Sequence, residues 1–117
     1  MEVSEIIIAG DTQGLEWRLP VFRFKGSKPD APSVYMQAAL HANELPGTAV
    51  LHFLCQTLRE AEAHGRIAGT IVIVPQANPI GASQSHFGEL QGRFELGTRT
   101  NFNRDFPLIS LRDRDTL

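Results

Sequence analysis

A histidine and a glutamate, His41 and Glu44, are the residues of this sequence whose types and spacing most directly suggest chemistry. They lie three residues apart, where an apolar strand-like segment gives way to a helix-like one, so both side chains can leave the backbone toward one point. Zinc hydrolases commonly hold the metal with nitrogen ligands, one carboxylate and an open position for water. The pair therefore suggests half of a zinc site, and a third protein ligand is still missing.

The bare His-x-x-Glu pattern is weak, because a small domain with 4 histidines and many acidic residues can produce it by chance. Its surroundings strengthen it. Residues 34–40 are apolar enough for a central strand, and functional groups in α/β sheets gather at the carboxyl ends of strands. Asn43 could cap the following helix, and Pro46 falls in its first turn, where a missing N–H costs nothing. The residues expected on the buried face of that helix are Val50, Phe53, Leu54, Thr57, Leu58 and Ala61.

A second group of polar residues lies in a late loop. Residues 81–97 are rich in Gly, Ser and Gln and form a segment too long for a mere connection, so function or disorder must explain it. Just beyond it, Asn103 and Arg104 stand between Phe102 and Phe106, which we expect to anchor the pair. A planar guanidinium beside an amide suits two-point binding of a carboxylate.

The elements that must position these groups can be read from the pattern. Residues 5–9 and 17–24 predict an antiparallel hairpin whose inward face holds Trp17, Leu19, Val21 and Arg23, with Pro20 favouring an edge position. Gly65 suits the left-handed end of the helix. Residues 70–74 predict a second apolar strand parallel to the first, and a right-handed crossover would set both strand ends on one rim. The fold class is therefore α/β: a mixed sheet with an antiparallel hairpin followed by a strand-helix-strand crossover.

Composition excludes several classes of function. The chain has 117 residues and a net charge of −2, with no basic stripe for nucleic acid and no polybasic patch for a membrane. The single cysteine, Cys55, allows no internal disulfide and is expected to pack in the core. The start of the sequence is acidic and lacks the pattern of a signal peptide. We expect a cytoplasmic protein with no nucleic-acid or membrane partner.

The order of these motifs is similar to that of the succinylglutamate desuccinylase/aspartoacylase family, a group of zinc carboxypeptidase-like hydrolases. The motifs are His41-x-x-Glu44, Asn78-Pro79, Arg93 and the run from Asn103 to Pro107. The resemblance implies that one zinc ion is the cofactor and that His41 and Glu44 are its first two ligands. It implies that Asn103 and Arg104 grip a substrate carboxylate. It assigns Arg93 to the scissile carbonyl and its oxyanion, with Arg99 as the rival for that role.

The sequence also departs from the family pattern. Asn101 stands where an acidic residue is usual, and Ala42 replaces a common glycine. The third zinc ligand and the general base of the family would both lie beyond Leu117, and His86 is only a remote substitute. Residues 1–117 are therefore expected to be one partial catalytic domain, the N-terminal portion of the family domain, inert alone and prone to self-association.

The resulting hypothesis is a zinc-dependent hydrolase that cleaves an N-acyl amide or peptide bond in a small carboxylate-bearing substrate, such as an acyl amino acid or a peptide. One alternative is a non-catalytic α/β module that binds an anion or a partner through Asn103 and Arg104. Another is a structural fragment in which His41 and Glu44 only make core hydrogen bonds.

Overall fold

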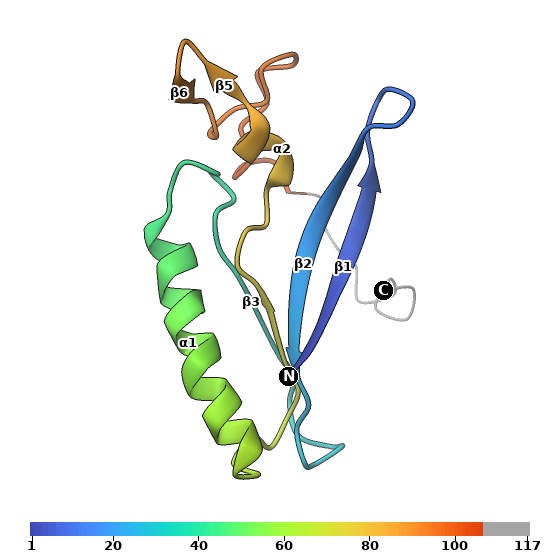
Figure 1. Cartoon of the computed structure of the whole chain (residues 1–117), viewed down its shortest axis with the longest axis vertical. Helices are drawn as coiled ribbons and strands as arrows, with labels where there is room; N and C mark the ends of the chain where they lie inside the picture. Colours follow the sequence, from blue (N-terminus) through green and yellow to red (C-terminus); the bar gives the residue numbers. More distant parts are fainter. Residues whose placement is uncertain (107–117) are drawn as a thin grey trace.

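The computed structural model describes residues 1–106, which form a four-stranded mixed sheet with one long helix beside it (Figure 1). The strand order is β1-β2-β4-β3, and a two-stranded sheet of β5 and β6 stands at one end of the molecule (Figure 1). The elements are β1 Glu2–Ala9, β2 Glu16–Phe24, β3 Val34–Gln37, α1 Pro46–Ala63, β4 Ile71–Val74, α2 Pro79–Ser83, β5 Ser85–His86 and β6 Glu89–Leu90.

The predicted antiparallel hairpin is confirmed, with β1 paired to β2 from Glu2 opposite Arg23 to Ala9 opposite Glu16. Trp17 and Leu19 are half-buried and Val21 is buried, but Arg23 is exposed, so its predicted inward position is wrong. A guanidinium without a partner is costly to take out of water. The deepest residue of β2 is instead Phe24 on the other face, fully buried against Leu51, Cys55 and other core residues.

The edge position that Pro20 favoured is also wrong, because β2 lies between β1 and β4. The proline is tolerated for a local reason. Strand β4 pairs with β2 only over Phe22–Phe24, so at Pro20 the strand has β1 as its single neighbour. A residue without an N–H is acceptable where one side of the strand needs no ladder bond.

The predicted β3–α1–β4 unit is present, and β3 runs parallel to β4 from Val34 opposite Ile71 to Gln37 opposite Val74. Strand β3 was predicted to be central, but within the described residues it is an edge strand, and it ends at Gln37 rather than at residue 40. The chain leaves it through Ala39, whose φ of 57° is uncommon for a residue with a Cβ. This turn directs Leu40 and His41 onto the rim of the sheet.

Helix α1 buries a different stripe from the one predicted. Leu51 and Cys55 are buried, with Leu54, Leu58 and Ala61 packed beside them, as predicted for the last three. Val50 and Phe53 are each 65% exposed, and Thr57 is exposed too, so their assignment to the buried face is wrong. The pattern of apolar residues fits two adjacent stripes on the helix, and the sheet covers only one of them.

The predictions for the two ends of α1 are confirmed in part. Pro46 begins the helix and Gly65 adopts a φ of 65° just past its end, as predicted. Asn43 does not cap it, because the cap position is Leu45 and no side chain bonds there. Residues 41–44 instead form a turn in which the Glu44 N–H donates to the His41 carbonyl, and that turn displaces the start of the helix by two residues.

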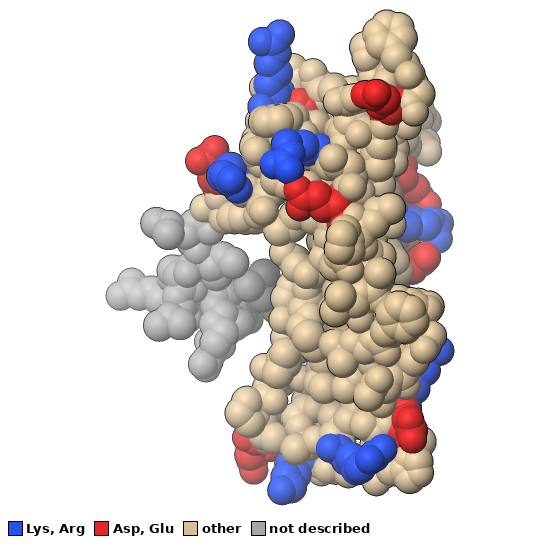
Figure 2. Space-filling model, turned by 90° about the vertical axis from the view of Figure 1, so that its left-hand side faces the viewer, with Lys and Arg blue, Asp and Glu red and all other residues tan. Residues whose placement is uncertain are grey.

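The face of the molecule over α1 carries few charged side chains across its middle, while Lys, Arg, Asp and Glu gather toward the two ends (Figure 2). The exposed Val50 and Phe53 belong to this helix. Within residues 1–106, no helix is both long and apolar enough to cross a membrane.

Candidate active site

The rim of the sheet forms the floor of the site, because β3 and β4 are parallel and both end there. The Ala38 N–H donates to the Val74 carbonyl and the Ala77 N–H donates to the Ala38 carbonyl, at 3.1 and 2.8 Å. These bonds continue the ladder past the strand ends. They hold the two chain segments that lead to His41 and Asn78 side by side.

Asn78 ties this rim together from a buried position, and sequence reasoning had given it no structural role. Its Nδ2 donates to the Leu40 carbonyl at 2.8 Å, and its Oδ1 accepts from the Gly81 N–H at 2.8 Å. The side chain is 6% exposed, so both polar ends need these partners. The available signal was Asn-Pro directly after a strand, which is the pattern of a helix N-cap followed by a proline in the first turn.

His41 and Glu44 face one another at this rim, as the sequence predicted. His41 Nδ1 and Glu44 Oε1 lie 3.2 Å apart, with the imidazole 4% exposed and the Glu44 side chain 54% exposed. The histidine is thus a buried group of fixed orientation, and the carboxylate reaches it from the solvent side.

Arg93 joins the same group from the late loop. Its guanidinium donates to Glu44 Oε1 at 2.5 Å. The loop lies directly on the turn that carries His41, because the Ala42 N–H donates to the Gly92 carbonyl at 2.9 Å. A Cβ at Gly92 would lie 2.5 Å from the Asn43 backbone nitrogen, so only glycine allows this close approach.

Arg99, the rival of Arg93, is placed differently. Its backbone adopts a φ of 63° and its N–H donates to the Glu95 carbonyl at 2.8 Å. The residue lies at the exposed tip of the loop beside Leu96. The geometry brings Arg93, and not Arg99, to the pair of His41 and Glu44.

Asn101 is the second residue that sequence reasoning left without a functional role. Its Oδ1 lies 2.8 Å from His41 Nε2 and accepts the N–H of Asn103 at 2.9 Å. It reaches this position because Phe94 and Asn101 form a β-bridge, and because the Phe102 N–H donates to the Arg93 carbonyl. The signal that could have found it was its place two residues before Asn103, where the family pattern is usually acidic.

Asn103 and Arg104 follow directly. Asn103 is half-buried and its backbone is held by Asn101, whereas Arg104 is exposed and donates to the Asn103 carbonyl at 2.6 Å. Phe102 is half-buried, but Phe106 is 59% exposed, so its predicted role as an anchor is wrong. Pro107, the last residue of the motif, lies outside the described residues.

The loop that carries these groups is braced by Glu95. Its carboxylate accepts the backbone N–H groups of Gly97 and Thr98, and these bonds hold the pKa of Glu95 below its usual value. The segment predicted as a long polar loop, residues 81–97, contains regular structure: the end of α2, and strands β5 and β6.

The donor atoms of His41 and Glu44 suit a shared zinc ion. Two ligands of a tetrahedral zinc, at bond lengths of about 2.0–2.1 Å, lie about 3.3 Å from each other, close to the 3.2 Å between Nδ1 and Oε1. Among residues 1–106, no group of three or more His, Cys, Asp and Glu side chains is placed to hold a metal. His86, the remote substitute, is exposed in β5 and packs edge-to-face against Phe87.

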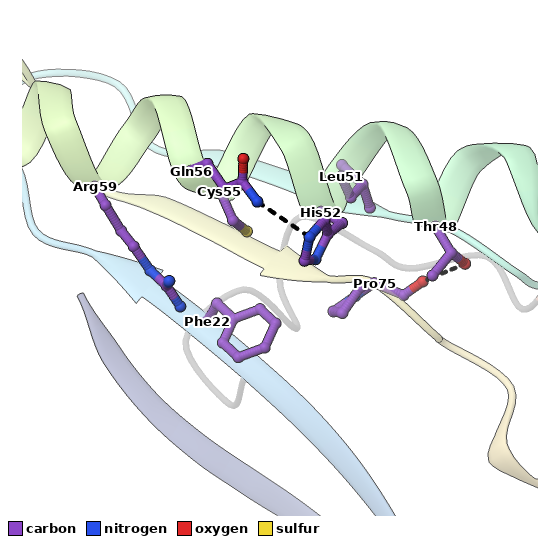
Figure 3. Close-up of a pocket in the computed structure, with 8 residues that line it drawn as sticks. All are labelled: Phe22, Thr48, Leu51, His52, Cys55, Gln56, Arg59 and Pro75. Carbon is purple, nitrogen blue, oxygen red and sulfur yellow. Dashed lines mark hydrogen bonds between the residues drawn. The ribbon is translucent and has the colours of Figure 1, made fainter.

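A separate hollow of about 270 Å³ lies between α1 and the sheet (Figure 3). Its lining is mainly apolar, and Figure 3 shows Thr48 bonded to the Pro75 carbonyl and His52 beside Gln56. Cys55 lies in this wall, where burial raises the pKa of its thiol, in agreement with its predicted packing role. No candidate site residue lines the hollow, whose residues are Phe22, Thr48, Leu51, His52, Cys55, Gln56, Arg59 and Pro75.

Comparisons with known proteins identify the family of this chain. The family model for the succinylglutamate desuccinylase/aspartoacylase catalytic domain matches residues 30–117. A solved structure from Shewanella amazonensis SB2B, assigned to that family, shares 33% identity over 100% of this chain with a TM-score of 0.80. A similarly assigned structure from Shewanella frigidimarina NCIMB 400 shares 31% identity over 97% of it, with a TM-score of 0.79. Among curated proteins, none matches.

A more distant likeness is to an aspartoacylase family protein from Mesorhizobium loti MAFF303099, with 26% identity over 69% of this chain and a TM-score of 0.53. The present chain spans 32% of the Shewanella amazonensis chain and 30% of the Shewanella frigidimarina chain. It therefore corresponds to about a third of the length of these relatives.

Proposed function

We propose, since the chain belongs to the succinylglutamate desuccinylase/aspartoacylase catalytic-domain family, that the complete protein is a zinc-dependent hydrolase. Its proposed substrate is a small carboxylate-bearing molecule with an N-acyl amide or peptide bond. The observation that carries the proposal is the 3.2 Å approach of His41 Nδ1 to Glu44 Oε1 at the rim of the sheet. We further propose that the protein acts in the cytoplasm.

In this proposal His41 and Glu44 hold the metal, and the third ligand comes from outside residues 1–117. A zinc ion there would act as a Lewis acid toward the scissile carbonyl and would make water a competent nucleophile near neutral pH. The chain's own contribution is orientation. The buried imidazole is fixed by the rim, so little rearrangement is needed for it to act as a ligand.

Arg93 is proposed to meet the oxygen of the scissile carbonyl. Its guanidinium is 46% exposed and already lies beside the Glu44 carboxylate. A guanidinium has five N–H donors, so those that do not face Glu44 can stabilise the negative charge that develops on a carbonyl oxygen.

Asn103 and Arg104 are proposed to bind the substrate carboxylate. Arg104 uses one nitrogen on the Asn103 carbonyl, which leaves the other donors of the fork for two parallel bonds to a carboxylate. The Asn103 N–H donates to Asn101 Oδ1, so the backbone of this carboxylate clamp, Asn103 and Arg104, is held close to His41.

The test is hydrolysis by a complete protein that contains this chain, before and after removal of metal by a chelator. We expect activity on an N-acyl amino acid to be lost with the metal and restored by zinc. Residues 1–117 alone should be inert, because a positioned general base contributes a factor of about a hundred to ten thousand to the rate. Full activity of the metal-free protein would contradict the proposal.

A further inference from the structure

We propose that the outer edge of β1 is a dimer interface, at which β1 of one copy pairs antiparallel with β1 of a second copy about a two-fold axis through Ile6. The two four-stranded sheets then join into one continuous sheet. Strand β1, Glu2–Ala9, contains none of the candidate site residues, so the dimer is independent of the proposed function.

Strand β1 is an edge strand without the usual protection. Among residues 1–106 its only neighbour in the sheet is β2, and all of its residues are exposed. Edge strands that stay unpaired are commonly short, bulged, or interrupted by proline or lysine. Strand β1 has 8 residues, contains neither proline nor lysine, and pairs with β2 without a bulge. Its outer N–H and C=O groups are therefore open to another strand.

The side chains of β1 also favour a partner strand. Its large apolar residues are exposed to water, and they are Val3, Ile6, Ile7 and Ile8. The charged residues of the strand are Glu2 and Glu5, and Arg18 Nη1 donates to the Glu5 carboxylate at 3.0 Å. The charge near the middle of the strand is thus already paired within its own copy. A second strand covers apolar surface there without burying an unpaired carboxylate.

The direction of the backbone groups limits how two copies can pair. The Gly10 N–H donates to the Leu15 carbonyl at 2.9 Å, so the even-numbered residues of β1 point their N–H groups at β2 and the odd-numbered ones point theirs outward. In an antiparallel pair of identical edges, outward-pointing residues lie opposite each other. The two-fold axis must then pass through a residue, and the residues near the middle of the strand are Glu5, Ile6 and Ile7.

The side chains select the axis at Ile6. An axis at Glu5 sets two carboxylates directly opposite each other, which destabilises a sheet. An axis at Ile7 limits the paired region to residues 5–9. With the axis at Ile6, residues 3–9 are paired and Glu5 lies opposite Ile7 of the second copy. This register combines a long paired region with no like charges opposed.

The same register builds an apolar row across the axis. Residues directly opposite each other in a sheet have their side chains on the same face, and Ile6 lies opposite Leu19 of β2. Leu19 and Ile6 of one copy therefore form one row with Ile6 and Leu19 of the other. Because each copy supplies the same two residues, the patch is complementary to itself, as a two-fold interface requires. The occupant that this edge fits is thus a second copy of the chain.

Exchange of charge at the axis tests the dimer and its register together in residues 1–117. All samples carry Phe53→Lys, so that the exposed Phe53 side chain of α1 does not contribute to association. We expect Ile6→Lys and Ile6→Glu each to weaken the dimer about tenfold or more in sedimentation, because two like charges meet at the axis. A mixture of the two variants should restore the dimer, since opposite charges then meet. A monomeric parent protein, or no recovery in the mixture, would overturn the proposal.

A cysteine at the axis gives a second measurement that introduces no charge. Cys55→Ala removes the native thiol. In that background Ile6→Cys should form a disulfide between copies on mild oxidation, because opposite residues at a non-hydrogen-bonded position have Cα atoms about 4.5 Å apart. Ser4→Cys is the matched control: it is equally exposed on the same face of β1, but it lies opposite Ile8 and should cross-link much less. Equal cross-linking at the two positions would refute the register, and this pair of variants decides if the charged ones do not fold.

Discussion

The two halves of the candidate site are held in place in different ways. The rim half is buried: His41 and Asn78 are 4% and 6% exposed, and backbone ladder bonds beside β3 and β4 fix them. The loop half is largely exposed: Arg93 and Arg104 reach solvent, and their positions depend on hydrogen bonds within residues 92–104. A change at the buried Asn78, which makes only structural hydrogen bonds, should therefore act on stability, and changes in the exposed loop should act on binding.

The largest effect is expected in the rim, at Asn78. Replacement by Ala would leave the Leu40 carbonyl and the Gly81 N–H without their partner in a buried place, which should lower the free energy of unfolding by up to about 3 kcal/mol. Urea denaturation of the chain measures it. Asn43→Ala is the matched control, with an expected change within about 0.5 kcal/mol. Equal urea midpoints for Asn78→Ala and Asn43→Ala would contradict the proposed difference between rim and loop.

The loop half should respond in substrate specificity instead. In a complete protein, Arg104→Lys should lower kcat/KM for a carboxylate-bearing substrate, with a loss of transition-state stabilisation of about 2 kcal/mol. The reason is that lysine cannot donate two parallel hydrogen bonds to a carboxylate. A matched neutral amide should be affected much less. Unfolding should be unchanged, since Arg104 is exposed.

Arg93→Lys is the matched comparison for that experiment. It should penalise the acidic and the neutral substrate alike, because the charge that develops on the scissile carbonyl does not depend on a remote carboxylate. If Arg104→Lys weakened both substrates equally, Asn103 and Arg104 would be anchors of the loop and not a clamp.

The uncovered stripe of α1 should produce self-association of residues 1–117. Val50 and Phe53 are each 65% exposed, on a face with few charges (Figure 2), and exposed apolar patches of this kind favour association. Sedimentation at high concentration should show species larger than a monomer, reduced in Phe53→Lys. Gln13→Lys, which adds the same charge in the exposed hairpin turn, should leave the distribution unchanged, and an equal reduction there would point to net charge alone.

The smallest effect is the pH response of the loop at Glu95. The pKa of this carboxyl is lowered by the backbone N–H groups of Gly97 and Thr98, so its contribution to loop order is present above the unfolded pKa. It is lost as the pH falls through the lower folded value. The amide NMR signals of Gly97 and Thr98 should report this loss in acid, and Glu95→Gln should abolish the response. Signals that titrate identically in both proteins would exclude the brace.

Much of the rim could be predicted from the sequence because it depends on local rules. Apolar runs gave the hairpin and the parallel strands, and a histidine at a strand end was correctly placed beside Glu44. The errors arose where tertiary contacts decide: Arg23 turned outward, β2 took an inner position despite Pro20, and the stripe of α1 against the sheet runs through Leu51 and Cys55.

The loop could not be predicted to the same depth. Whether Arg93 or Arg99 meets Glu44 depends on where the bridge between Phe94 and Asn101 closes, and no local periodicity encodes that closure. The role of Asn101 depends on a contact across sixty residues with His41. A sequence pattern can name such residues as candidates, but only the fold brings them together.

The central claim is that His41 and Glu44 bind zinc, and its most direct test is a calorimetric titration of residues 1–117 with zinc. We expect weak binding, with water, a buffer anion or a histidine of another molecule completing the site, and loss of that binding in His41→Ala and in Glu44→Ala. His86→Ala, which removes an exposed histidine, should bind as the wild type does. Equal affinity in the wild type and His41→Ala would contradict the account and would favour a non-catalytic module that binds an anion through Asn103 and Arg104.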